Sequence, residues 1–162
     1  MQLSRFLPAF AAAVLLAACQ TTADPSGLSH RQVATLRANG FVQTERGWEF
    51  DVGSRVLFAT DESSLVPDQR ERLKTMAHTL HAVEIDAARV EGHTDVTGSD
   101  GYNEALSLRR ARAVADALIE GGMAQNGVVP TGLGARDPVE SNATAQGRHE
   151  NRRVVIIVGG QS

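Results

Sequence analysis

The sequence contains very little of three kinds of residue that usually point to a class of protein. Its single cysteine, among 162 residues, excludes an intramolecular disulfide and a zinc site built from several thiolates. Aromatic residues make up only 4% of the chain, and 16 Lys and Arg are outnumbered by 19 Asp and Glu. Both counts argue against a nucleic-acid-binding protein, which needs a basic surface with stacking side chains. The length suits one domain that buries a core without cross-links.

The chain also lacks an apolar run long enough to cross a membrane. Its longest run, 6–18, has thirteen residues, whereas a transmembrane helix needs about 20. With Arg5 in front of it, the run is typical of the hydrophobic region of an export signal. It leads into a Leu-Ala-Ala-Cys sequence that resembles the bacterial lipobox, in which the cysteine is diacylated and becomes the new N-terminus. We therefore predict a signal peptide over 1–18 and lipidation of Cys19, and Gln20 at the next position implies transport to the outer membrane.

The rest of the chain alternates between the periodicities of helices and strands. After a linker over 19–28, rich in turn-forming residues, apolar residues recur at helical spacing in some segments and at alternate positions in others. Five consecutive β-branched residues near the C-terminus are typical of a strand buried on both faces. The alternation predicts an α/β, or α+β-like, sandwich in which a mixed sheet packs on its helices. The expected helices are 30–39, 68–81, 102–120 and 144–150, and the expected strands are 48–52, 55–58, 88–92, 128–133 (at an edge, because of Pro130) and 153–158.

The first predicted helix carries explicit start and stop signals. Ser29 and Gln32 are spaced as a capping box, and Gly40 follows the last helical residue. A helix of about ten residues is too short to be stable alone, so its formation depends on docking. We hypothesise that the segment 29–45, this helix and a connector, acts as a switch that is packed on the domain in one state and extended in another.

Catalytic and metal-binding motifs are weakly supported. A His-Thr-Asp sequence at 93–95 invites a metal or hydrolase interpretation, with His78, His81 and His149 as helpers. A metal site needs three or four convergent ligands, and His78 and His81 have no acidic partner in register. The sequence has no Gly-x-Ser-x-Gly elbow, and the lone Gly-Leu-Gly at 132–134 is more typical of a turn than of a phosphate loop. We therefore expect no enzyme activity, no cofactor and no metal.

The helix predicted over 102–120 places an arginine where it cannot easily reach water. At 100° per residue, Arg110 falls on the apolar arc that should face the sheet, together with Asn103 and Leu106. An unpaired buried charge is costly, so Arg110 needs a carboxylate or a pocket, and Asp95 in the preceding loop is the obvious candidate. Two interpretations stay open at this point. Asp95 and Arg110 form a structural ion pair, or they share a cleft in which they bind the ammonium and the carboxylate of a zwitterion.

Several motifs with fixed spacings resemble the signature of the OmpA C-terminal-like family of peptidoglycan-binding domains. They are Val-Glu-Gly-His-Thr-Asp-Val-Thr-Gly at 90–98, the Tyr-Asn, Leu-Ser, Arg-Arg-Ala and Ala-Val sequences within 102–114, Gly-Arg at 147–148, and Asn-Arg-Arg-Val at 151–154. The resemblance covers about 46–159. It implies a mixed sheet of about four strands packed against two long helices, here preceded by a short helix, and noncovalent binding of the diaminopimelate in the peptidoglycan stem peptide.

The resemblance also assigns site residues. The family's acidic residue corresponds to Asp95, its arginine fifteen positions later to Arg110, and the leucine one turn before that arginine to Leu106. Thr60, Asp61 and Asn103 complete the predicted peptidoglycan-binding site.

Two other parts of the signature carry less weight for binding. Ala59 departs from the acidic residue or glycine that many members have after the preceding phenylalanine, which weakens the prediction for this loop. Asn151, Arg152 and Arg153 are expected to be structural, tying the last helix to the final strand.

The N-terminal half adds a narrower resemblance. Val-Ala-Thr-Leu at 33–36, Gly-Phe at 40–41 and Gly-Trp-Glu-Phe at 47–50 are similar to the lead-in of signalling outer-membrane lipoproteins. These capture a periplasmic repressor protein and thereby release an inner-membrane diguanylate cyclase. The implied partners are peptidoglycan, the outer membrane through the lipid, and such a repressor. The alternatives are a Pal-type structural tether between outer membrane and cell wall and, with less support, a cell-wall hydrolase.

Overall fold

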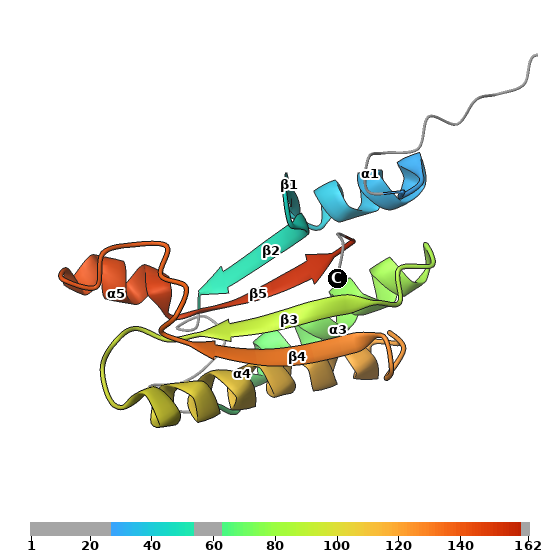
Figure 1. Ribbon diagram of the computed structural model, residues 1–162. Helices are drawn as coiled ribbons and strands as arrows, with labels where there is room; N and C mark the ends of the chain where they lie inside the picture. Colours follow the sequence, from blue (N-terminus) through green and yellow to red (C-terminus); the bar gives the residue numbers. More distant parts are fainter. Residues whose placement is uncertain (1–26, 54–62, 160–162) are drawn as a thin grey trace, which may run out of the picture.

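The structure is a computed structural model that describes residues 27–53 and 63–159 (Figure 1). The predicted signal peptide, Cys19 and the strand expected over 55–58 lie outside these ranges. Within the two ranges, none of the helices has the length and the apolar character that crossing a membrane requires.

A five-stranded mixed sheet lies at the centre, in the order β1-β2-β5-β3-β4. β3 and β4 pair in parallel, and the other neighbours are antiparallel. This confirms the predicted mixed sheet and the edge position of the strand that contains Pro130, and every residue of β5 is buried, as expected for the final strand. The strands are β1 (Val42–Thr44), β2 (Gly47–Gly53), β3 (Ala88–His93), β4 (Val128–Gly134) and β5 (Arg153–Val158).

The family resemblance implies about four strands, whereas the described sheet has five, because it includes β1, which is not among the expected strands. The strand expected over 55–58 is not part of this comparison, since it lies outside the described residues. β1 forms a tight hairpin with β2, in which Thr44 pairs with Gly47. All three of its residues are exposed, so the strand shows no alternation of buried and exposed positions. A strand of this kind leaves no periodic signal in the sequence.

Two long helices, α3 (Pro67–His81) and α4 (Asp100–Glu120), cover one face of the sheet (Figure 1). Their buried residues form one hydrophobic core with the inward-facing side chains of the strands. The short helix α5 (Ala145–Asn151) lies at the end of the sheet where β2 ends and β5 begins (Figure 1). These helices agree with the predicted ranges to within two residues at each end.

The N-terminal helix α1 (His30–Ala38) is docked on this core rather than separate from it. Its capping box is formed as predicted, with Ser29 and Gln32 bonding reciprocally. The Leu36 side chain is completely buried, and the Phe41 ring packs 5.4 Å from that of Phe50. The Arg37 guanidinium lies over the indole ring of Trp48, 5.2 Å from its centroid. Helix α1 and Phe41 therefore share one core with the rest of the domain in this structure.

Helix α4 lies unusually close to the backbone of the strands beneath it. A Cβ at Gly92 of β3 would stand 2.1 Å from the carbonyl oxygen of Ser107, and one at Gly132 of β4 would stand 2.7 Å from that of Glu104. The two glycines are paired in the sheet, so together they form a flat patch on which the helix rests. Only glycine permits this approach, and the approach sets the position of everything that α4 carries.

We expect Gly92→Ala to lower the free energy of unfolding by about 2 kcal/mol or more, because the added methyl group would push α4 away from the sheet. Gly101→Ala is the matched control: Gly101 lies in the first turn of the same helix, and nothing stands within 4 Å of its Cβ. The control should be neutral or slightly stabilising. Urea denaturation of both variants tests this, and equal stability of Gly92→Ala and the unmodified protein would contradict it.

Candidate functional site

The predicted site lies where β3 ends and the loop 94–99 leads into α4. The Thr94 N–H donates to the carbonyl oxygen of Gly134, which ties the start of the loop to the end of β4. At the other end Gly98 adopts a left-handed φ of 97°, and the Ser99 hydroxyl caps α4 by accepting the N–H three residues on. The loop is therefore fixed on both sides of Asp95.

Asp95 is buried and accepts two strong hydrogen bonds. Its Oδ1 accepts the backbone N–H of Thr97 at 2.8 Å, and its Oδ2 accepts Nη1 of Arg152 at 2.5 Å. Burial by itself would raise the pKa of Asp95, but the Thr97 N–H and the Arg152 guanidinium outweigh it and hold this pKa below its ordinary value. Asp95 is therefore a carboxylate of fixed orientation at neutral pH.

Three other predicted residues share one buried face of α4. Asn103, Leu106 and Arg110 follow one another along this face, and the Asn103 side-chain amide donates to the carbonyl oxygen of Asp95 at 3.2 Å. At 1.5 Å of rise per residue, Arg110 lies about 10 Å further along the helix than Asn103. Arg110 is only 5% exposed, as its place on the apolar arc predicted. Among the described residues, the ion-pair partner of Asp95 is Arg152 and not Arg110.

The remaining predicted contacts, Thr60 and Asp61, lie outside the residues that the structure describes. Their part in the site stays a prediction.

The contact that Arg152 makes differs from the expected tie between the last helix and the final strand. Its neighbours do have structural partners: the Asn151 side chain bonds the backbone of Val139 and Glu140, and the Arg153 guanidinium bonds Asp137. Arg152 instead reaches Asp95, 57 positions earlier in the chain. No local pattern joins these two residues. Only the sheet order, which sets β5 beside β3, brings them together.

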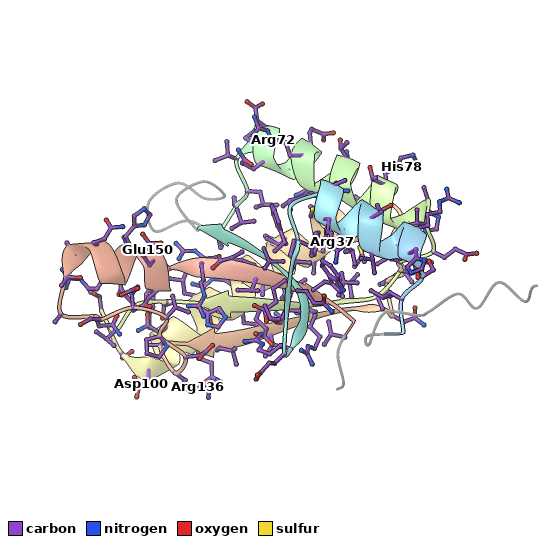
Figure 2. All side chains as sticks on the ribbon, turned by 90° about the horizontal axis from the view of Figure 1, so that it is seen from above. Arg37, Arg72, His78, Asp100, Arg136 and Glu150 are labelled. Carbon is purple, nitrogen blue, oxygen red and sulfur yellow. The ribbon has the colours of Figure 1, made fainter. Side chains whose placement is uncertain are left out.

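A cavity of about 310 Å³ opens beside the loop. Its lining comes from Val96 of the loop, the first turns of α4, the end of β4 and the two residues after it. Two of the lining residues, Arg136 and Glu104, form an ion pair at 3.3 Å. Figure 2 shows Asp100 and Arg136 of this lining at the end of the molecule that lies away from Arg37 on α1. Asp95, Asn103, Leu106 and Arg110 are not among the residues that line this cavity, so it adjoins the predicted site without containing it.

His93, two residues before Asp95, is buried on the sheet face that the helices do not cover. Neither ring nitrogen has a hydrogen-bond partner among the described residues, although Asp137 and Glu91 each approach one of them at 3.9 Å. Burial, followed by the charge of Arg153, lowers the pKa of His93 from 6.5 to about 4. His93 is therefore a neutral, buried support of the loop. In the described parts of the chain, no group of three or more His, Cys, Asp and Glu side chains could hold a metal ion.

The sequence signature of the OmpA family matches residues 57–152. The chain belongs to the OmpA family. It is also similar to the outer-membrane lipoprotein YfiB of Pseudomonas aeruginosa, with 47% identity over 94% of this chain and 90% of that protein. The putative lipoprotein YfiB of Escherichia coli is 40% identical over 90% of each chain.

Among solved structures, the peptidoglycan-associated lipoprotein of Burkholderia pseudomallei superposes with a TM-score of 0.57 and 28% identity. That match covers 64% of this chain and 87% of the other. These similarities confirm the predicted family and its mixed sheet packed on helices. They also confirm the expected location, an outer-membrane lipoprotein that faces the periplasm.

The burial of His93 predicts that stability falls in mild acid. Its pKa is lower in the folded protein than in the unfolded chain, so the unfolded chain binds more protons once the pH falls below about 6.5. This contribution is complete above pH 6.5 and is lost as the pH falls toward 4. Between pH 7 and pH 5 we expect the loss to be about 2 kcal/mol.

Urea denaturation at pH 7 and pH 5, with His93→Gln as the control, measures this loss. The variant lacks the titrating group, so its stability should change less over this pH range by about the same 2 kcal/mol. Parallel losses in the two proteins would show that His93 is not buried in its neutral form.

Proposed function

We propose that this protein is an outer-membrane lipoprotein that binds peptidoglycan noncovalently through the diaminopimelate of the stem peptide. The observation that carries the proposal is a fixed carboxylate next to a helix face that also carries a buried arginine. Asp95 is held in one orientation, and Arg110 lies on the face of α4 whose Asn103 bonds the carbonyl oxygen of Asp95. A free amino-acid head group, such as the one at the end of diaminopimelate, presents an ammonium and a carboxylate on one carbon. It therefore suits a site that holds both charges.

Each residue then has a distinct task. Asp95 has lone pairs left after bonding Thr97 and Arg152, and these accept the ligand ammonium. Arg110 lies on the buried face of α4, and the N–H donors of its guanidinium bind the ligand carboxylate in a bidentate manner. Leu106 lies between Asn103 and Arg110 and provides an apolar contact for the methylene groups of diaminopimelate. The name of the similar Burkholderia lipoprotein, which is peptidoglycan-associated, supports the wall as the ligand.

Beyond peptidoglycan binding, we propose a more specific role in signalling. In this proposal the protein, like YfiB, sequesters a periplasmic YfiR-type repressor, releases an inner-membrane diguanylate cyclase and so favours biofilm growth. The support is that the YfiB similarity extends over at least 90% of the chain, well beyond the family signature at 57–152. The second candidate, a Pal-type structural tether, is favoured by the Burkholderia structure. That match covers only 64% of this chain.

The ligand site is tested by co-sedimentation with purified sacculi. Asp95→Asn removes the charge that would pair with an ammonium, and Arg110→Lys keeps a charge but loses the fork. We expect each to weaken binding at least about tenfold. Arg109→Lys is the matched control, because Arg109 is the exposed neighbour on the same helix and should change nothing.

Two results would count against this site. Unchanged sedimentation of both site variants would refute the proposed ligand contacts. Release of soluble muropeptides during the incubation would instead favour the hydrolase alternative, and we expect none.

The signalling role predicts that the protein captures a periplasmic protein and that α1 responds. We expect a repressor to copurify from the periplasm, and the amides of residues 30–39 to lose protection from hydrogen exchange in the complex. Such a loss would identify the segment 29–45 as the switch. A copurified partner with unchanged protection would reject the switch, and the absence of a partner would favour the structural tether.

A further inference from the structure

Arg152 is a site residue to which the proposed peptidoglycan contacts assign no role. It directly follows α5 and precedes β5, and its Nη1 bonds Asp95 Oδ2 at 2.5 Å. Among the described residues this is the only hydrogen bond of its side chain, although a guanidinium carries five N–H donors. The Arg152 side chain is 34% exposed, whereas that of Asp95 is 9% exposed. Its guanidinium is therefore partly exposed next to Asp95, and it has N–H donors that no described residue accepts.

The backbone on both sides of Arg152 is held firmly. α5 packs so tightly on the preceding loop that a Cβ at Gly147 would stand 2.0 Å from the carbonyl oxygen of Ser141. The Asn151 amide bonds the backbone of the same loop, and the next residue, Arg153, is buried at the start of β5. The position of the Arg152 guanidinium is therefore fixed by the fold, and its bond to Asp95 is supported from both sides.

The ligand ammonium and the Arg152 guanidinium would share one carboxylate. In the proposed complex Asp95 accepts the ammonium while it still bonds Arg152, so a single negative charge faces two positive charges. A ligand with a further carboxylate near its head group would supply a second negative charge for Arg152. A charge-assisted bond from guanidinium to carboxylate is among the stronger contacts available.

We propose that Arg152 is a specificity-determining residue that bridges Asp95 and a second carboxylate of the ligand. The proposal rests on the proposed peptidoglycan function and deepens it. The ligand class is a zwitterionic amino acid that carries another free carboxylate nearby. Diaminopimelate is of this class when it ends a stem tripeptide. Arg110 binds the carboxylate beside the ammonium, and Arg152 binds the other one.

The experiment compares two probes on the full-length lipoprotein in detergent. One is the tripeptide L-Ala-γ-D-Glu-diaminopimelate with a free C-terminal carboxylate, and the other is the same tripeptide as its C-terminal amide. Calorimetry should show that the unmodified protein prefers the acid about tenfold. In Arg152→Gln this preference should fall to about one, mainly because the acid binds more weakly.

Two further variants separate a contact made by the Arg152 fork from a general loss of structure. Arg152→Lys keeps the charge without the fork and should retain an intermediate preference, which a disrupted fold would not produce. Arg109→Gln removes an exposed charge from α4 and should retain the full preference. A preference for the acid that persists in Arg152→Gln, or that is absent from the unmodified protein, would overturn the role of Arg152.

The same binding measurements distinguish a failure of the proposed peptidoglycan contacts from a failure of the proposed role of Arg152. If Asp95→Asn and Arg110→Lys bind both tripeptides as the unmodified protein does, the peptidoglycan contacts themselves are wrong. If those two variants lose both tripeptides while Arg152→Gln keeps its preference for the acid, only the role of Arg152 is wrong.

Discussion

The contact between α4 and the backbone of β3 and β4 determines the geometry of the whole binding end. Gly92 and Gly132 lie side by side in the sheet, and the helix rests on them with no side chain between. Because of this contact, the Asn103 side-chain amide reaches the carbonyl oxygen of Asp95. It also allows the Ser107 hydroxyl to accept the N–H of Gly134 at 3.0 Å. A helix held one side chain further away would lose both bonds, and Arg110 would no longer be buried beside the sheet.

The loop and the residue before β5 explain how the site keeps the Asp95 carboxylate ionised in a buried place. Burial disfavours the Asp95 carboxylate, but the fixed loop gives it a backbone donor, and the residue before β5 gives it a guanidinium. His93, one step back along β3, receives no such partner among the described residues and stays neutral. Two titratable residues of one segment thus differ in charge, because donors stabilise the charged form of Asp95, whereas burial and the charge of Arg153 disfavour the charged form of His93.

Local patterns were enough to predict most of the helices, the buried strand β5 and the edge strand with Pro130, because periodicity and capping act over a few residues. The core-facing position of Arg110 followed from helix geometry alone. β1 could not be found, because it is short and wholly exposed. The bond from Arg152 to Asp95 could not be found either, since it depends on the order of strands that are far apart in the sequence.

That strand order also relates the site to the N-terminal helix. β5 begins beside Arg152 at the site, and its last residue, Val158, pairs with Trp48, whose ring Arg37 of α1 covers. Six residues of strand separate the two ends by roughly 20 Å. The Asp95 loop and the docked α1 are therefore separated by the length of this strand, and Figure 1 shows the loop between β3 and α4 and the helix α1 at opposite ends of the sheet. An influence of Asp95 on α1 that travels through the fold would pass along the packed strands, and β2 and β5, which pair from Trp48 and Val158 to Gly53 and Arg153, both run from one end to the other.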